Sequence, residues 1–262
     1  MTRTHLPEYL IEGALLGLFM VSACSFTIAL EYPDAAAHRA IADPLLRRVL
    51  IGVAMGLTAM ALIYSPWGRR SGAHMNPSLT LTFLRLGKVS GGDAAGYVAA
   101  QFAGGIAGVL LVGAAARMAA GHPAVHYAAT VPGPQGAGRA FAGEFAISFL
   151  MMAMVLVTSN VAALARWTGV FAGLLVCTYI SVEAPLSGMS MNPARTFASA
   201  VVAGEWRDIW IYFGAPPLGM LAAAECYVRA RGLRRVYCAK LRHGRAARCI
   251  FRCNHDALGE DA

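Results

Sequence analysis

Residues 71–80 read Ser-Gly-Ala-His-Met-Asn-Pro-Ser-Leu-Thr, and residues 187–196 read Ser-Gly-Met-Ser-Met-Asn-Pro-Ala-Arg-Thr. Both stretches place Met-Asn-Pro after Ser-Gly, and both lead into a short apolar segment, at residues 78–86 and 194–202. One Asn-Pro pair is ordinarily a turn in a loop. Two copies in equivalent places, with the same surroundings, indicate a duplicated structural element instead.

The apolar segments after the two motifs are too short to cross a hydrocarbon core of about 30 Å, which takes roughly 20 residues of helix. We therefore expect them to be re-entrant half-helices. Proline is favoured at the first helical position, which suits Pro77 and Pro193, and Asn76 and Asn192 are strong N-caps. Each Asn side-chain oxygen would accept a hydrogen bond from its own helix, which leaves the amide N–H₂ free to face a lumen.

The rest of the chain has the composition of a membrane protein. Of its 262 residues, 57% are hydrophobic and 14% are charged, and the mean hydropathy is +0.54, whereas a soluble domain needs more charge to cover its surface. Six apolar stretches are long enough to span a bilayer: residues 10–30, 46–66, 95–118, 140–160, 167–184 and 208–228. The sequence predicts an all-α membrane protein with six transmembrane helices and two half-helices.

The duplication divides the chain into two repeats, at about 8–118 and 139–230. Each repeat runs as a helix with a Glu (Glu12 or Glu144), a second helix, the Asn-Pro segment and a third helix. Because three spans is an odd number, the second repeat enters the membrane from the opposite face, as an inverted repeat does. The half-helix N-termini, each worth about half a positive charge, then meet near the midplane.

A pore is the expected result of that meeting. Two fixed amide donors at the positive ends of two helices orient a water molecule, interrupt a proton-conducting chain and repel cations. Irregular backbone is tolerated at membrane depth only where it is buried in protein or lines a cavity. We therefore expect the carbonyls before each motif to supply acceptors along the path: those of Gly72, Ala73, His74, Gly188, Met189 and Ser190.

The net charge of +8 is concentrated after the last apolar stretch. No acidic residue lies between Glu225 and Asp256, a segment that holds nine cations: Arg229, Arg231, Arg234, Arg235, Lys240, Arg242, Arg245, Arg248 and Arg252. In a soluble protein this run would indicate nucleic acid, but after a transmembrane helix it follows the positive-inside rule and attraction to anionic lipid. We expect one channel domain at 1–230, a basic cytoplasmic tail at 231–262, both termini in the cytoplasm, a cell-membrane location and no nucleic-acid partner.

The tail also holds three of the six cysteines, Cys238, Cys249 and Cys253, with His243 and His255 nearby. A metal site there is one alternative, but the spacing matches no strong zinc pattern. We expect unpaired tail thiols, no metal and no cofactor. The sequence shows no Ser-His-Asp, metal-ligand or phosphate-loop pattern, so an enzyme is not expected.

A family resemblance rests on the paired motifs, on the Glu in the first and fourth spans, on Ser-Gly-Ala-His before the first motif, and on Tyr97-Val-Ala-Ala-Gln101 in the third span. Over residues 8–230 the sequence resembles the aquaporin family, also called major intrinsic proteins. The resemblance implies a right-handed six-span bundle with two half-helices, one pore per subunit and a homotetramer.

The resemblance also implies roles for single residues. Asn76 and Asn192 resemble the family's central donor pair. Glu12 and Glu144 resemble buried carboxylates that brace the loops entering the half-helices, and we expect His74 to take part in this bracing. For the two Glu residues, snorkelling at a helix end is the alternative.

The family's narrowest constriction has an arginine, which Arg195 resembles because it directly follows the second motif. By spacing, the other positions are Met55, Ile180 and Met189, although each is also plausible as a lipid-facing or core residue. Strict water channels commonly have a Phe in the second span and a His in the fifth, and this set has no His. At the motif ends, Ala194 fits the family, while Ser78 replaces an Ala and should preserve the half-helix.

The predicted solute is water, with small uncharged solutes such as glycerol, ammonia or peroxide left open. Family members that carry glycerol typically have Asp after the second-motif Arg and Pro-Leu in the sixth span. This chain has Thr196 after the Arg and the aromatic pair Tyr212-Phe213 near the place that corresponds to the Pro-Leu. The apolar constriction and its flexible Met side chains favour larger solutes instead. The alternatives are therefore a facilitator of glycerol-like solutes or an inverted-repeat secondary transporter, which would need intramembrane carboxylates for a coupling ion.

Overall fold

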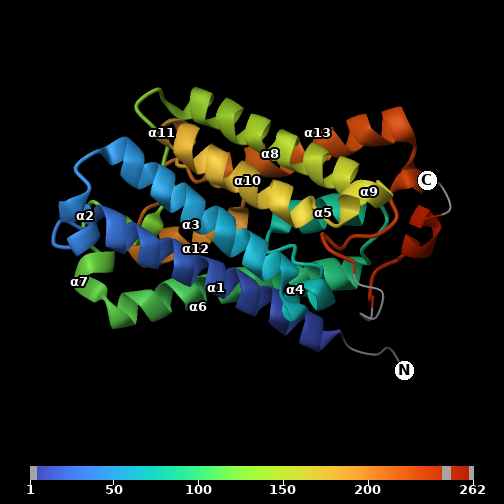
Figure 1. Ribbon diagram of the computed structural model, residues 1–262, viewed down its shortest axis with the longest axis horizontal. Helices are drawn as coiled ribbons and strands as arrows, with labels where there is room; N and C mark the ends of the chain where they lie inside the picture. The colour runs from blue at the N-terminus through green and yellow to red at the C-terminus, as the bar shows by residue number, and fades with distance from the viewer. Residues whose placement is uncertain (1–4, 244–248, 260–262) are drawn as a thin grey trace.

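The computed structural model of this chain describes residues 5–243 and 249–259. Its long helices run side by side along the longest axis of the molecule (Figure 1). The first repeat contributes α1 (Leu6–Glu31), α3 (Pro44–Tyr64), the short α5 (Pro77–Arg85) and α6 (Gly91–Ala115). The second contributes α8 (Ala137–Ser159), α10 (Thr168–Val182), the short α12 (Pro193–Ala203) and α13 (Trp210–Arg231). The remaining elements are short: α2 (Ala36–Ala40), α4 (Pro66–Ser71), α7 (Arg117–Ala120), η1 (His126–Ala128), α9 (Ala162–Ala165), α11 (Ala184–Ser187), η2 (Leu233–Arg235) and η3 (His255–Gly259).

Local sequence signals set the ends of these helices. Asp43 and Ser90 cap α3 and α6 with side-chain oxygens that accept backbone N–H groups of the first turn. α12 ends at Gly204, whose φ of +70° lies in the left-handed region that glycine adopts without steric cost. Each end of α5 and α12 differs from the sequence prediction by one residue.

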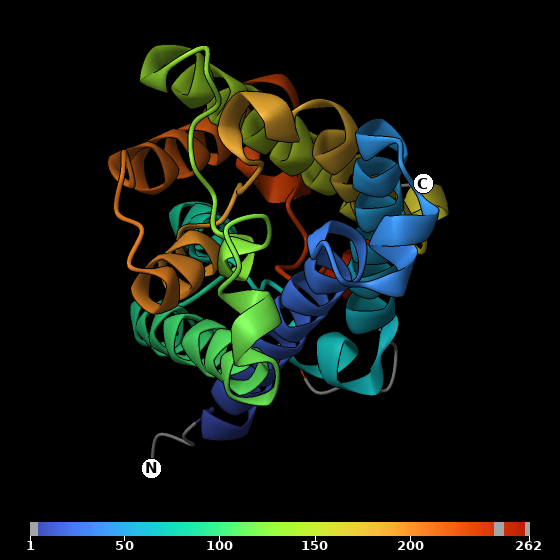
Figure 2. The ribbon, with the colours of Figure 1, turned by 90° about the vertical axis from the view of Figure 1, so that its left-hand side faces the viewer.

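The two repeats interlock. α1 packs along α6 and α8 packs along α13, while α3 and α10 join one repeat to the other. α12 packs against α6 and α5 packs against α13, so each half-helix contacts the last long helix of the other repeat. α5 lies toward the end of the bundle where α1 begins and α12 toward the end that carries α2 (Figure 1). Figure 2 shows the bundle end-on, with α12 between α6 and α13.

Glycine allows the close approach of α1 and α6. A Cβ atom on Gly104 would lie 1.9 Å from the Gly13 carbonyl oxygen, and one on Gly108 would lie 2.3 Å from that of Gly17. The two helices therefore touch backbone to backbone, as small residues permit in membrane bundles. Any side chain at these positions would push the helices apart.

Four helices in the described part of the chain are long and apolar enough to cross a membrane by themselves: α1, α3, α6 and α8. The sequence predicted six spans, and the other two are α10 and α13. α10 has 15 residues, and α13 carries Glu225, Arg229 and Arg231 near its end. Leucines exposed on the outside of the bundle, as a lipid environment favours, include Leu18, Leu57, Leu110, Leu111, Leu150 and Leu174.

After α13 the chain folds back across the end of the bundle where α1 begins (Figure 1). Residues 236–241 are all 5% exposed or less. The Tyr237 N–H donates to Asn160 Oδ1 (2.8 Å), and the Leu241 N–H donates to the Gly72 carbonyl (3.1 Å). The segment predicted as a basic tail is thus packed, over these residues, against the loop that precedes the first half-helix.

Candidate pore

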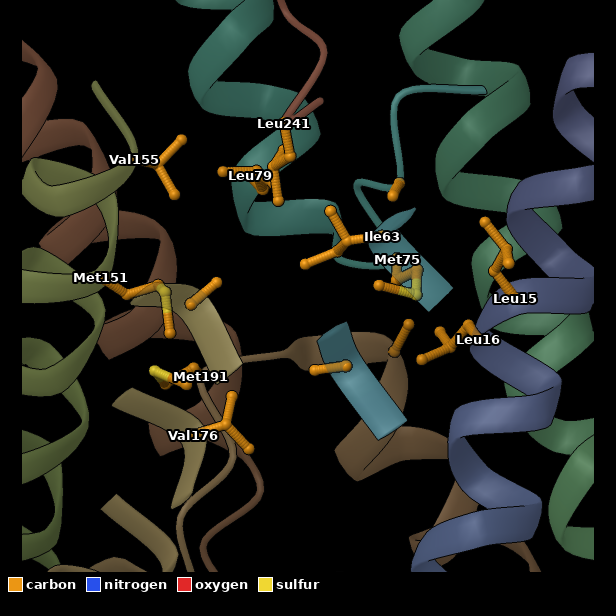
Figure 3. Close-up of a cluster of buried hydrophobic side chains, with 14 of the residues drawn as sticks. Leu15, Leu16, Ile63, Met75, Leu79, Met151, Val155, Val176, Met191 and Leu241 are labelled. Atoms are coloured by element: carbon orange, nitrogen blue, oxygen red, sulfur yellow. The ribbon is translucent and has the colours of Figure 1, made fainter. Parts of the chain in front are cut away.

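A cavity of about 640 Å³ lies between the two repeats. It extends from Glu31 and Arg48, near α2, past Asn76 and Asn192 to Leu241 of the tail. Its wall is rich in methionine, a flexible apolar side chain, and is lined by Met55, Met75, Met151, Met189, Met191 and Met220. Figure 3 shows Met75, Met151 and Met191 among them. Both motif asparagines therefore face one shared space, as the sequence predicted.

The two asparagines cap their own half-helices and hold the opposite loop. Asn76 Oδ1 accepts the Ser78 N–H (2.8 Å), and Asn192 Oδ1 accepts the N–H groups of Ala194 (3.1 Å) and Arg195 (3.2 Å). The Asn76 amide also donates to the Met191 carbonyl (2.7 Å), and the Asn192 amide donates to the Met75 carbonyl (2.7 Å). The expectation of wholly free amides was wrong, because one N–H of each closes a reciprocal link between the motifs and only the other is left for the cavity.

The backbone before each Asn alternates in the same unusual way. Ala73 and Met75 have φ values of +56° and +49°, and Met189 and Met191 have values of +49° and +54°. Side chains other than glycine rarely adopt this left-handed region, which costs about 1–3 kcal/mol per residue. The strain is repeated at equivalent positions and aims the Met75 and Met191 carbonyls at the opposite asparagine.

Glu12 of α1 supports the first loop from below. Its Oε1 accepts the Ser71 hydroxyl (2.7 Å) and the His74 N–H (3.0 Å), and its Oε2 accepts the Met75 N–H (2.7 Å) and the Gln101 amide (3.1 Å). The carboxylate is fully buried. These bonds supply partners for the donors of a loop that belongs to no helix.

Glu144 of α8 supports the second loop in the same way. Its Oε1 accepts the Ser187 hydroxyl (2.8 Å) and the Ser190 N–H (2.6 Å), and its Oε2 accepts the Met191 N–H (2.7 Å). It is also fully buried, so neither Glu lies at the surface position that snorkelling requires. Both are placed where a loop-bracing carboxylate would stand.

A tyrosine completes each loop from the third long helix of its repeat. The Tyr97 hydroxyl of α6 donates to the Ser71 carbonyl (2.6 Å), and the Tyr212 hydroxyl of α13 donates to the Ser187 carbonyl. Sequence reasoning assigned Tyr97 to the family pattern but gave neither tyrosine a role. Their equivalent places in the two repeats were the available signal.

The residue two before each Asn differs between the loops. His74 stacks between Phe83 and Phe251, with ring centroids 5.4 Å from each, and its Nε2 donates to the Ala239 carbonyl (2.8 Å). Ser190 has no ring, but it bonds through its hydroxyl to Thr196, just as His74 Nδ1 bonds to Thr80 Oγ1 (3.0 Å). His74 therefore connects the first half-helix to the tail.

The predicted acceptors do not all line the cavity. Ala73, His74, Gly188, Met189 and Ser190 do. Gly72 was wrongly assigned: its carbonyl accepts the Leu241 N–H, and the Phe251 ring fills the space that a Cβ atom on Gly72 would need. Four motif residues form the buried first turns of α5 and α12 outside the cavity lining: Pro77, Ser78, Pro193 and Ala194.

The four predicted constriction residues line the same cavity: Met55, Ile180, Met189 and Arg195. Arg195 follows the Asn192 cap in the first turn of α12, and within the described part of the chain its buried Nη1 has no hydrogen-bond partner. A guanidinium donor without a protein partner is available to a polar solute. The predicted constriction would thus combine one cation with thioether and aliphatic side chains.

The tail was the part of the site that sequence reasoning missed. Leu241 reaches the cavity and lies beside Leu79 of α5 (Figure 3). Next to it, Lys240 is 2% exposed and donates to the Arg69 carbonyl (2.9 Å), and burial lowers the pKa of its ammonium. The predicted tail therefore forms one end of the cavity wall.

Long apolar helices, two half-helices that meet through their caps and a cavity that passes both caps define a helical membrane protein built as an inverted repeat. Comparison with known families agrees with that class. The model of the family described as "Major intrinsic protein" matches residues 2–227, and the chain belongs to this family. The match stops before the tail.

Plant aquaporins are among the similar proteins. The chain is 38% identical over 179 residues to "Aquaporin NIP3-1" of Oryza sativa subsp. japonica, which covers 67% of this chain and 55% of that protein. It is 35% identical over 178 residues to "Putative aquaporin NIP4-1" of Arabidopsis thaliana, which covers 68% of this chain and 61% of that protein. The matched region spans less than two thirds of the length of these relatives.

A solved structure has the same fold. The X-ray structure of the aquaglyceroporin from Plasmodium falciparum superposes with a TM-score of 0.70 and covers 86% of this chain and 96% of that chain, at 16% sequence identity. At that identity the likeness shows the fold alone.

Proposed function

We propose that the protein is a passive transmembrane channel that conducts water and small uncharged solutes and excludes protons and ions. The observation that carries the proposal is the pair of asparagine amides that face one cavity from two opposed helix N-termini. Each N-terminus contributes about half a positive charge. A water molecule between them turns its oxygen toward both amides, so it cannot pass a proton along a chain of like-oriented waters.

Exclusion of cations has a second source in Arg195. Its guanidinium lines the cavity with a buried Nη1 that has no partner in the described structure. A fixed positive charge there repels cations and donates hydrogen bonds to a neutral solute. Charge selection and solute selection are thus proposed to act at neighbouring points on one path.

A facilitator of small polyols is the second candidate. It is favoured by the cavity wall, in which Met55, Ile180 and Met189 stand beside Arg195 and no histidine accompanies them in the proposed constriction. Flexible thioethers adapt to larger solutes more readily than rigid aromatic rings do. The same residues therefore decide between water alone and water with glycerol-like molecules.

Stopped-flow light scattering on proteoliposomes tests the proposal. Osmotic shrinkage in sucrose should be faster than in empty vesicles, and glycerol entry measured on the same preparation gives the solute ratio. Met55→Phe and Ile180→His should each raise the ratio of water to glycerol permeability. Leu57→Phe, on the exposed face of α3, is the matched control and should leave the ratio unchanged.

Two results would contradict the proposal. Shrinkage no faster than in empty vesicles would rule out a water channel. Saturable, gradient-coupled uptake would favour a secondary transporter, which needs carboxylates that bind an ion. Glu12 and Glu144 instead accept three or more protein hydrogen bonds each, so their oxygens are already occupied.

The orientation, location and assembly of the chain are also proposals. We propose a multi-pass cell-membrane protein with both ends in the cytoplasm, since basic residues crowd the end of the bundle where α13 stops and favour the inside. We also propose a homotetramer, the assembly that the family resemblance implies. Protease treatment of intact and inverted vesicles should cleave the tail only in the inverted ones, and native mass spectrometry should give four chains.

A further inference from the structure

Four potential metal ligands meet in the tail: Cys238, His243, Cys249 and Cys253. One ligand atom from each residue lies within 4.8 Å of each of the others. Cys238 Sγ is 3.6 Å from Cys249 Sγ, and Cys253 Sγ is 3.3 Å from His243 Nε2. Sequence reasoning expected unpaired thiols here because the spacing Cys-x₄-His-x₅-Cys-x₃-Cys is not a familiar zinc pattern, yet the fold brings all four side chains to one point.

The distances fit a tetrahedral ion. With metal–sulfur bonds of about 2.3 Å and a metal–nitrogen bond of about 2.0–2.1 Å, tetrahedral ligands lie about 3.8 Å apart for two sulfurs and about 3.6 Å for sulfur and nitrogen. We propose that these four residues bind one zinc-class divalent ion and that the ion fixes the tail on the pore. Three thiolates and one imidazole suit Zn²⁺, and a set of four protein ligands leaves no open position, as in structural sites.

The ligands differ in burial in a way that suits ion entry. Cys238 is buried, His243 and Cys249 are half-buried, and Cys253 is exposed. An ion can therefore reach the site from solvent while one side stays closed. The imidazole of His243 is also held in place, because its ring stacks on His255 with centroids 4.0 Å apart.

The contacts between tail and pore alternate with the ligands along the chain. Ala239, which accepts from His74, and Leu241, which lines the cavity, lie between the ligands Cys238 and His243. Phe251, which stacks on His74, lies between the ligands Cys249 and Cys253. An ion that joins the four ligands therefore ties both contact segments together over the first Asn-Pro loop.

This placement makes the ion a regulator of the channel, an inference that rests on the proposed function. With the ion bound, Leu241 is held beside Leu79 in the cavity (Figure 3), and an apolar constriction of this kind opposes the passage of water. Without the ion, the two contact segments of the tail are no longer joined to each other. We therefore expect the cavity to be wider at Leu241 in the chelated protein than in the zinc-loaded protein.

Metal content tests the site without reference to transport. Full-length protein purified with Zn²⁺ under reducing conditions should hold about one ion per chain by plasma mass spectrometry, and Co²⁺ in its place should give thiolate charge-transfer bands and a tetrahedral d–d spectrum. Cys249→Ser and Cys253→Ser should lose the ion and these bands. Cys226→Ser, an exposed cysteine on α13 outside the cluster, should keep both.

Absence of metal and of the cobalt spectrum in the folded wild-type protein would overturn the site, as would equal metal content in all the variants. A Cys238–Cys249 disulfide in the reduced preparation would also overturn it, since those sulfurs are then consumed. The cobalt spectrum is measured on the wild-type protein, so it tests the metal site even if one of the variants fails to fold.

Stopped-flow shrinkage of proteoliposomes tests the regulation. Chelation, Cys249→Ser and Leu241→Ala should each raise water permeability about twofold or more over the zinc-loaded wild type. Equal permeability in zinc-loaded and chelated wild type would overturn the regulatory role. A protein that binds one ion but never exceeds empty vesicles supports the metal site and contradicts the proposed function, so the two failures are distinguishable.

Discussion

Residues 71–76 and 187–192 enter the bundle from opposite ends, and a buried glutamate beneath each accepts a serine hydroxyl and two backbone N–H groups. A tyrosine hydroxyl above each donates to the carbonyl of the same serine. Even the left-handed residues fall at equivalent positions. Up to the asparagines, the two loops are one structure built twice.

The residues around this shared frame differ. His74 and Ser190 each bond to the threonine six residues further on. Only His74 also contacts the tail, and only the second threonine, Thr196, also bonds to Thr130 of the loop before α8. On the far side of the asparagines, the position that holds Leu79 in α5 holds Arg195 in α12. The comparison shows that hydrogen bonding keeps the two frames alike, while the cavity-lining arginine and the tail contact each belong to one repeat only.

The largest expected effect comes from breaking the shared frame. Glu12→Gln and Glu144→Gln each place an amide N–H₂ where donors converge on a buried acceptor, so each should lower the free energy of unfolding by about 3 kcal/mol or more. Thermal denaturation of detergent-solubilised protein measures the loss. Glu225→Gln, whose partner is the half-exposed Arg85, is the control and should cost about 1 kcal/mol or less. A large loss at one glutamate alone would contradict the equivalence of the two frames.

His74→Ser makes the first loop resemble the second. The variant loses two ring stacks and the bond to the Ala239 carbonyl, which should cost about 2 kcal/mol and release the tail. Limited proteolysis followed by mass spectrometry should show faster cleavage after residue 231. Ser190→Ala, the matched change in the other loop, should leave that cleavage rate unchanged, and equal rates in wild type and His74→Ser would refute the connection.

Arg195→Leu makes the second half-helix resemble the first. Without the guanidinium, glycerol permeability relative to water should rise about tenfold, which corresponds to about 1.4 kcal/mol, and cation leakage should become measurable. Stopped-flow scattering and a cation-sensitive dye report these changes. Arg207→Leu in the exposed loop before α13 is the control, and an unchanged ratio in Arg195→Leu would remove this residue from the constriction.

Tyr97→Phe and Tyr212→Phe should have the smallest effects and equal ones. Each removes the hydroxyl that donates to a buried serine carbonyl, which should lower the free energy of unfolding by about 1 kcal/mol. Thermal denaturation of the two variants side by side measures this. A difference between them well above that size would show that the tyrosines are not equivalent.

The parts of this structure that the sequence predicted are those with a local or repeated signal. An Asn-Pro pair indicates where a helix begins, so the sequence predicted the ends of the half-helices to within one residue. Glu12 and Glu144 were found because they recur. The partner of each asparagine amide was not predictable, because the Met191 carbonyl is 115 residues from Asn76 and only the closed pair of loops brings them together.

The tail was unpredictable for the opposite reason, because it occurs once. No second copy marks its ligands, and the spacing between Cys238 and Cys253 matches no strong zinc pattern. Its contact with the pore joins Ala239 to His74 across 165 residues. Basic composition suggested a segment that follows the channel, whereas a run of buried residues at 236–241 packs against it.

The reciprocal link between the two Asn-Pro loops also fixes the order in which parts of this protein can fold during its synthesis. The Met191 carbonyl reaches Asn76 only after 115 further residues have been synthesised, which at about 5–20 residues per second takes roughly 6–23 s. Throughout that interval the first half-helix must wait in the membrane with its amide and the Met75 carbonyl unlinked. A chain that terminates before residue 192 cannot complete the link, so translation of the second repeat is what finishes the folding of the first.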